Sequence, residues 1–274
     1  MRVLTWNLWW RFGDWQRRGK AIDSVLAACP ADIYGLQEVW ATDTENDAHL
    51  LAHRHGLHHV WAPSPRPQLW QQRLGDHGAQ IGNAILSRWP IVTSEVHHLP
   101  AGDSDAAADE GRTLLFAQID SPVGVVSMFT TQLNSQPQDS AVRCAQVRTI
   151  AAVVARHRSP DFPTVLTGDF NADPHSDEIR LMEGHRTAPP VPGQVLLDAW
   201  RYAAPGDLGL TWNARDNPYV QATYEPSARI DYVFVGPPAA GGTGSVRSAR
   251  LIGDDAIDGV WPSDHAGVLV ELRS

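Results

Sequence analysis

The sequence has few cysteines and no long hydrophobic run. Only Cys29 and Cys144 occur in 274 residues, too few for a disulfide framework or a cysteine-based metal cluster. No apolar stretch approaches the roughly 18 residues of a membrane-spanning helix, and no signal-peptide pattern opens the sequence. We therefore expect a globular, monomeric protein whose free thiols lie in a reducing, cytoplasmic setting.

Positive charge is also scarce. Twenty-two basic residues against 31 acidic ones leave a net charge of −9, and Lys20 is the only lysine. A broad basic face would be needed for non-specific nucleic-acid binding, because that affinity comes mainly from neutralised phosphates. The composition argues against such a face. It still allows an enzyme that contacts a few phosphates locally.

Strand-like and helix-like patterns alternate along the chain, with no internal repeat and no linker. We expect strands at 2–8, 32–39, 57–62, 83–92, 113–120, 124–133, 163–168, 229–235 and 266–272. Helices are expected after Asp14, a plausible N-cap, and at 139–157. The segment 184–228 is expected to be mostly irregular, with one short helix near 196–202. The pattern predicts one α/β domain over residues 1–274, with two stacked sheets and helices outside.

Carboxylate, amide and imidazole side chains occur at the ends of six of these strands. They are Asn7, Glu38, Gln132, Asn134, Asp169, Asn171, Asp231, Asp264 and His265. In the stretch "VLTGDFNADP", Asp169 and Asn171 are two positions apart, and on an extended backbone they share a face. Chance alone would place some of these residues in mid-strand. The pattern therefore predicts a polar functional site at the strand ends.

The residue types favour a hard divalent cation. Glu38 and Asp264, helped by Asn7, supply the oxygen ligands that Mg²⁺ or Mn²⁺ prefers. No cysteine and histidine set has zinc spacing. The histidine pairs at 58–59 and 97–98 lack acidic companions at ligand spacing and are interpreted as structural.

The remaining residues of the set favour hydrolysis. His265 follows Asp264 directly, and Asp231 is available to accept its second N–H, which would orient the imidazole and stabilise its charge. Asp169 would then orient or deprotonate a water molecule, and Asn171 would donate to a phosphoryl oxygen.

Six segments carry a family resemblance: TWNL, LQEV, GNAILSR, GDFNADP, RIDYVFV and SDHAGVLVEL, in this order across nearly the whole chain. Together they resemble the endonuclease/exonuclease/phosphatase superfamily, which includes pancreatic-type deoxyribonucleases, abasic-site endonucleases and neutral sphingomyelinases. The resemblance implies a four-layer sandwich of two mixed sheets flanked by helices. It also implies Mg²⁺-dependent, nuclease-like phosphodiester hydrolysis by in-line attack of water.

The resemblance also implies a role for each matching residue. Glu38 would be the main metal ligand, with Asn7 and Asp264 nearby. Asp169 would activate the water, or hold a second metal ion, and Asn171 would donate to the phosphate. His265, held by Asp231, would stabilise the pentacovalent phosphorus.

Gln132 departs from the family pattern. Most relatives have histidine in this place, although abasic-site endonucleases have tyrosine. Glutamine hydrogen-bonds a phosphate or leaving oxygen but cannot deliver a proton. Three alternatives stay open: a natural variant with altered chemistry, an engineered inactive form, and a protein that binds phosphate without turnover.

Substrate contacts are less specific in the sequence. Arg66, Arg73 and Arg112 are candidates for bidentate phosphate contacts, and Trp9 for stacking on a base or sugar. The substrate is expected to be a phosphoester, in nucleic acid or in a phosphorylated small molecule. A phosphatase or phosphodiesterase acting on a lipid or metabolite is the alternative.

Overall fold

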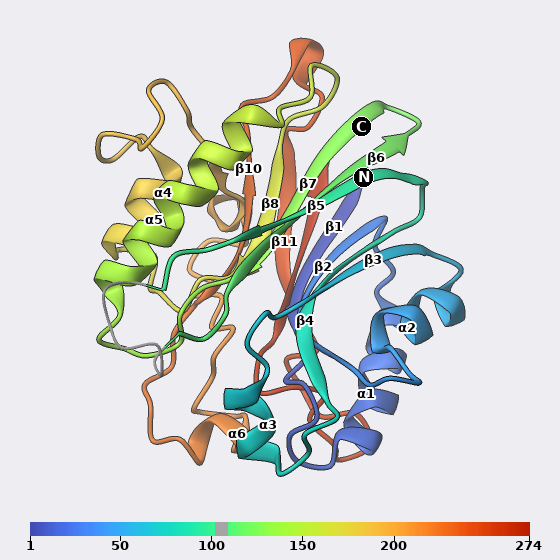
Figure 1. Cartoon of the computed structure of the whole chain (residues 1–274). Helices are drawn as coiled ribbons and strands as arrows, with labels where there is room; N and C mark the ends of the chain where they lie inside the picture. The colour runs from blue at the N-terminus through green and yellow to red at the C-terminus, as the bar shows by residue number, and fades with distance from the viewer. Residues whose placement is uncertain (102–108) are drawn as a thin grey trace.

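Two six-stranded mixed sheets form the centre of the molecule in the computed structural model, which describes residues 1–101 and 109–274 (Figure 1). Sheet A contains, in spatial order, β11 (Val246–Ile252), β12 (Gly267–Leu272), β1 (Arg2–Asn7), β2 (Ile33–Ala41), β4 (Gln80–Ser87) and β3 (His58–Pro63). Sheet B contains β5 (Ile91–His98), β6 (Thr113–Ser121), β7 (Gly124–Gln132), β8 (Val165–Asp169), β10 (Asp231–Val235) and β9 (Leu197–Asp198). The pairs β1–β2 and β7–β8 are parallel, and the other pairs are antiparallel.

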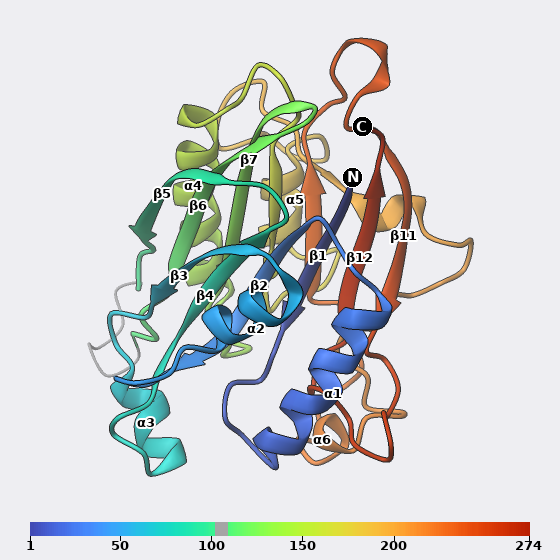
Figure 2. The same cartoon turned by 90° about the vertical axis from the view of Figure 1, so that its right-hand side faces the viewer.

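Helices cover the outer face of each sheet, which makes the expected four layers (Figure 2). Apolar residues of α1 (Trp15–Ala28) and α2 (Asp47–His55) pack on sheet A, and those of α4 (Ser140–Arg156) and α5 (Asp177–Glu183) pack on sheet B. Shorter helices are α3 (Gln68–Leu74), α6 (Pro218–Gln221), η2 (Ala199–Tyr202) and η3 (Ala240–Gly242). None of the helices in the described part of the chain is long and apolar enough to cross a membrane.

Strand alternation explains how the layers form. Val3 and Val165 belong to the core between the sheets, whereas their neighbours Leu4 and Leu166 pack against the helices outside. Successive residues of a strand point to opposite faces, so apolar residues in a row fill both cores. This explains why the buried strands are continuous apolar runs in the sequence.

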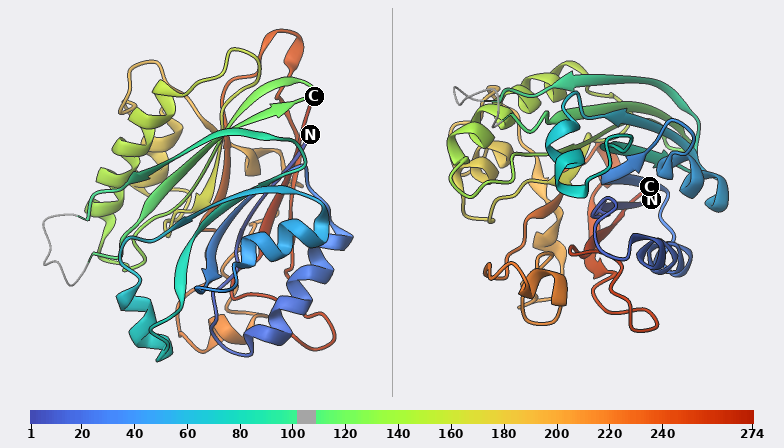
Figure 3. Two further views of the ribbon diagram at one scale, coloured as in Figure 1. Left: turned by 45° about the vertical axis from the view of Figure 1, so that its right-hand side comes forward. Right: turned by 60° about the horizontal axis from the view of Figure 1, so that its bottom comes forward.

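The same alternation collects polar residues at one end of the space between the sheets. Asn7, Gln132, Asp169 and Asp231 lie in inward positions at the ends of β1, β7, β8 and β10, and all four are buried. The two chain termini lie side by side at the opposite end, as the views in Figure 3 show. The topology therefore places the polar residues together without help from loops.

Close packing of the sheets requires a glycine in β2. A Cβ on Gly35 would lie 2.0 Å from Thr167 Oγ1 and 2.8 Å from Thr130 Oγ1 across the sandwich. Gln37, two residues further on, donates to Thr130 Oγ1 at 2.8 Å. The sheets thus approach each other closely just behind the polar end.

Several expectations about single elements were wrong. The expected strand 83–92 is two strands, β4 in sheet A and β5 in sheet B, separated at Pro90, which has no N–H and restricts the residue before it. The elements α2, α3, α5 and β11 were not expected. Both cysteines are free and half-buried.

Candidate functional site

An open cleft of about 260 Å³ lies at the polar end of the sandwich. Six of the predicted site residues line it: Glu38, Gln132, Asp169, Asn171, Asp264 and His265. Its walls include aromatic side chains, among them Trp9, Phe12, Trp70 and Trp212, and one guanidinium group, that of Arg73. Asn7 and Asp231 lie directly behind this surface, each hydrogen-bonded to a residue that lines it.

A β-bulge brings Glu38 to the cleft. The register of β2 against β4 shifts by one residue between Leu36 and Val39, and Glu38 has a φ of 52°. Regular alternation would send Glu38 outward, because Gln37 already points inward to Thr130. A glutamate with positive φ costs on the order of 1–3 kcal/mol, and bulges commonly re-aim a functional side chain.

Two amides connect the carboxylates of Glu38 and Asp169. Asn7 Nδ2 lies 3.2 Å from Glu38 Oε1 and 3.1 Å from Asp169 Oδ2. Gln132 Nε2 donates to the same two oxygens, at 2.7 Å and 3.2 Å. Since both amides only donate to these oxygens, they hold the two carboxylates close together although they carry like charges.

The orientation of the Gln132 amide is set by an ion pair behind it. Arg112 Nη1 donates to Gln132 Oε1, and Arg112 Nε donates to Glu110 Oε2 at 2.8 Å. Glu110 in turn accepts from the hydroxyl and the N–H of Ser135. Burial would raise the pKa of Glu110, but Arg112 and Ser135 hold it below its usual value. Gln132 is therefore fixed with its NH₂ toward the acidic residues.

His265 and Asp231 form a buried pair. The imidazole Nδ1 lies 2.8 Å from Asp231 Oδ2, and Trp212 packs edge-on against the ring at 5.0 Å. Burial lowers the pKa of His265, but Asp231 and the two other neighbouring carboxylates raise it well above its usual value. The free Nε2 lies 3.9 Å from Asp169 Oδ2. The geometry therefore favours an imidazolium that presents Nε2 at the cleft.

The turn after β8 sets the positions of the Asp169 and Asn171 side chains. Asp169 Oδ1 accepts the N–H of Asn171 at 3.0 Å, and Asn171 Nδ2 donates to the carbonyl of Leu133. The φ of Asn171 is 46°, a conformation that asparagine tolerates better than most residues. Burial is the main cause that raises the pKa of Asp169.

The donor set fits a divalent metal ion. Glu38, Asp169 and Asp264 are buried carboxylates on one cleft, and burial, with Glu38 nearby, raises the pKa of Asp264 to about 7. Buried carboxylates of this kind are costly unless a cation offsets them. Asp169, Asp231 and His265 also place ligand atoms within 4.8 Å of one another. That second group is already joined by the imidazole hydrogen bond, so Glu38 and Asp264 are the better candidates.

The predicted substrate contacts separate into two groups. Trp9 and Arg73 line the cleft, and Trp9 also packs against Tyr219 at 4.5 Å. Arg112 does not line it, because its guanidinium group is engaged with Gln132 and Glu110. Arg66 lies outside it and pairs with Asp109 at 2.8 Å.

Sequence reasoning missed residues that position the site. Arg18 is buried and donates to five backbone carbonyls, those of Leu8, Trp9, Trp10, Phe12 and Pro262. Ser263 joins the first and last strands by donating to the carbonyl of Asn7 at 2.7 Å and accepting the N–H of His265. An arginine and a serine carry no distinctive sequence signal.

Two residues of α4, Arg143 and Gln146, support the loop beside Gln132. Arg143 bonds Glu178 at 2.9 Å and donates to the carbonyls of Asn134 and Gln136, and Gln146 exchanges hydrogen bonds with Asn134. The loop residues 135–137 line the cleft. These helix residues therefore act on the cleft through the loop.

Curated proteins similar to this chain are sphingolipid enzymes. Sphingomyelin phosphodiesterase 3 of Mus musculus is 31% identical over 123 residues, 38% of this chain and 18% of that protein. Inositol phosphosphingolipids phospholipase C of Schizosaccharomyces pombe is 25% identical over 224 residues, 76% of this chain and 48% of that protein. The matched region is less than half the length of either relative.

Solved structures with the same fold cover the whole chain. D. rerio TDP2 complexed with single-strand DNA product has a TM-score of 0.75 at 19% identity, covering 100% of this chain and 99% of that one. The endonuclease/exonuclease/phosphatase from Beutenbergia cavernae has a TM-score of 0.70 at 24% identity, covering 100% and 71%. At the level of sequence, residues 4–265 match the family model, so the chain belongs to the Endonuclease/Exonuclease/phosphatase family.

Proposed function

We propose that the protein is a Mg²⁺- or Mn²⁺-dependent phosphodiester hydrolase with nuclease-like chemistry. One observation carries this proposal: the carboxylates of Glu38, Asp169 and Asp264 and the imidazole of His265 converge on one cleft. Phosphoester hydrolysis needs groups that orient water and groups that stabilise negative charge, and this cleft offers both. Residues from both sheets line this one cleft, which also supports a single catalytic domain over residues 1–274.

Each residue has a role that follows from its contacts. Glu38 and Asp264, with Asn7 beside them, would hold the metal ion, which when bound polarises the phosphoryl oxygens. Asp169, oriented by three N–H donors, would orient and deprotonate the attacking water. Asn171 lines the cleft and would donate to the phosphate.

His265 would neutralise charge on the opposite side. Its raised pKa keeps it protonated, and Asp231 occupies Nδ1, so Nε2 is the nitrogen left to donate to a phosphoryl oxygen. The imidazolium would stabilise charge that develops in the pentacovalent transition state. Asp231 would keep the ring in this orientation.

Gln132 would be a working residue of this site. Arg112, itself paired with Glu110, donates to its carbonyl oxygen, and its NH₂ bridges two carboxylates, so all its polar atoms are used. This complete set of partners supports the natural-variant alternative over an engineered form. Binding without turnover has less support, because the water-orienting and charge-stabilising residues are all present.

Different observations support the two candidate substrate classes, nucleic acids and phospholipids or small phosphodiesters. The aromatic walls of the cleft would stack with nucleic-acid bases, but Arg73 is the only guanidinium group among the described residues that line it. Two relatives are named for sphingolipid phosphodiesters, which makes a phospholipid or a small phosphodiester the second candidate.

Activity measurements on a substrate panel test the proposal. The panel contains single- and double-stranded DNA, RNA, sphingomyelin in detergent, inositol phosphates and bis-p-nitrophenyl phosphate, each with Mg²⁺, Mn²⁺ or chelator. We expect turnover that chelation abolishes, with the Asp169→Asn protein as an inactive control. Turnover that survives chelation, or that Asp169→Asn retains, would contradict the mechanism.

A further inference from the structure

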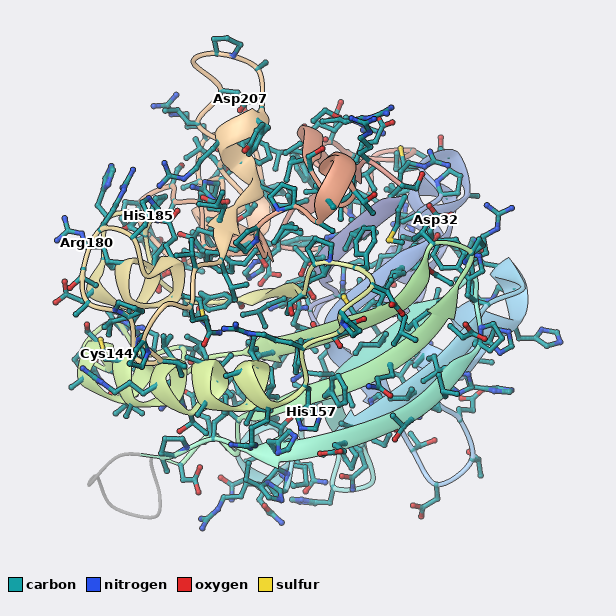
Figure 4. All side chains as sticks on the ribbon, turned by 90° about the horizontal axis from the view of Figure 1, so that it is seen from above. Asp32, Cys144, His157, Arg180, His185 and Asp207 are labelled. Atoms are coloured by element: carbon teal, nitrogen blue, oxygen red, sulfur yellow. The ribbon has the colours of Figure 1, made fainter. Side chains whose placement is uncertain are left out.

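Three side chains that do not line the catalytic cleft converge on the outer face of sheet B. Glu95 and His97 lie two residues apart on β5 and share a face, and His157 is the C-cap of α4. Figure 4 shows His157 at the end of α4. One ligand atom from each of the three residues lies within 4.8 Å of the other two.

The two imidazoles present the same nitrogen to one carboxylate oxygen. Glu95 Oε2 lies 3.3 Å from Nε2 of His97 and 3.5 Å from Nε2 of His157. In a tetrahedral zinc site with bonds of about 2.0–2.1 Å, ligand atoms are separated by roughly 3.3–3.4 Å. Both separations therefore already match those of a metal-bound set, and two imidazoles with one carboxylate are a known zinc donor set.

Packing holds these side chains in place. The ring of His157 lies 4.3 Å from that of Phe116 on β6, and its carbonyl accepts the hydroxyl of Ser127 on β7 at 2.5 Å. The rings of His97 and His157 are 5.8 Å apart. Both ends of the cluster are thus fixed by the sheet, which reduces the entropy lost when a ligand binds.

His97 lacks a hydrogen bond that would explain its position. Within residues 1–101 and 109–274, its Nε2 is buried and has no hydrogen-bond partner, although Glu95 is near. A buried nitrogen without a partner is unusual and requires an explanation. Burial lowers the pKa of His97, with His157 and Arg156 adding to this and Glu95 opposing it.

We propose that Glu95, His97 and His157 bind a divalent first-row transition ion of the zinc class, with one coordination position open to water. Imidazole ligands select such ions over Mg²⁺ and Ca²⁺. The half-exposed Glu95 gives the ion a path from solvent.

The site would connect an edge strand to a helix. Among the described residues, β5 pairs with β6 alone and exposes Val92 and Val96, so it is an open edge of sheet B. A metal ion would fasten this strand to the end of α4. Because an ion that binds only the folded state stabilises it, the structural consequence would be higher stability in the presence of zinc.

Zinc titration by calorimetry tests the proposal without any measurement of activity. The background is the full chain with Glu38→Gln and Asp264→Asn, which weakens zinc binding in the cleft. In this background we compare His97→Ala/His157→Ala with His98→Ala, an exposed histidine next to His97 that points to the other side of β5. Glu95→Gln serves as a second variant, because its exposed position makes loss of the fold improbable.

We expect the background protein and His98→Ala to bind one Zn²⁺ with the same affinity. The double histidine variant should lose affinity at least about 100-fold, and Glu95→Gln about 10- to 100-fold, in keeping with the loss of ligands. Zinc should raise the Tm of the background protein but not that of the double histidine variant. Equal zinc affinity in the background, double-histidine and Glu95→Gln proteins, or no stoichiometric binding in the background, would overturn the proposal.

Discussion

Asp231 Oδ2 lies 2.8 Å from His265 Nδ1, and both side chains are buried where β10 and the segment before β12 meet. If this contact fixes the imidazole for catalysis, Asp231→Asn should lower kcat nearly as much as His265→Ala. The double variant should be little worse than either single variant, since residues that act as a unit are non-additive. kcat measured for all three proteins checks this. Fully additive losses would mean that the residues act separately.

Glu38 is expected to be essential for metal binding. Glu38→Gln keeps the size of the side chain but removes an anionic ligand, so kcat should fall by on the order of 10³-fold or more. Calorimetry with Mn²⁺ should show weaker binding in the same protein. Glu45→Gln, an exposed glutamate shortly after β2, is the matched control and should change neither quantity. Near-normal turnover of Glu38→Gln would remove the proposed metal site.

Gln132→His should lower activity rather than restore it. An imidazole in this place would face the guanidinium group of Arg112, which now donates to the carbonyl oxygen of Gln132. We expect kcat to fall by about 10-fold or more, because the bridge between Glu38 and Asp169 is lost. A gain of roughly 10²- to 10⁴-fold, typical of a positioned acid–base group, would instead indicate a site altered from histidine.

The stability of the metal-free protein should fall as pH rises. The pKa of Asp264 is about 7 in the folded protein against an ordinary 3.8, so the ionised carboxylate is less favourable when folded. The protonated carboxyl of Asp264 therefore stabilises the folded protein. This stabilisation is complete below about pH 4 and is lost as pH rises through about 7. The raised pKa of His265 acts in the same direction.

Urea unfolding in chelator at about pH 5 and about pH 8 measures this difference. Asp264→Asn should reduce it, because the amide does not titrate. Mg²⁺ should also reduce it, since the ion stabilises the ionised carboxylates. A free energy of unfolding that increases with pH in the wild-type protein would contradict the assignment.

The sequence predicted the layers and most of the cleft for a physical reason. Asn7, Asp169 and Asp231 are the inward residues at the ends of buried strands, and strand ends can be identified from apolar runs. The strand-end pattern included Glu38, and Glu38 lines the cleft, but the strand continues to Ala41 and the bulge that turns Glu38 inward has no sequence signal.

Contacts between distant segments were not predictable. Glu110 belongs to an acidic run of sequence, a composition typical of a solvated loop, yet it is buried against Arg112. Arg112 looked like a phosphate contact because the sequence does not show that Gln132 lies beside it. Likewise, His157 is 62 positions from Glu95, so their proximity depends on how α4 crosses sheet B.

Because of the bulge in β2, the position of the Glu38 carboxylate depends on the number of backbone residues between Leu36 and Val39. Deleting Gln37 would restore a regular pleat, and the glutamate would then take the inward position of Gln37, which points at Thr130 Oγ1 instead of at Asn7 and Gln132. Conversely, the bulge absorbs the extra residue locally, so the pairing of β2 with β4 remains regular on both sides. Substitutions elsewhere in sheet A can therefore accumulate without moving the carboxylate, whereas a single-residue deletion at this point would remove it from the cleft.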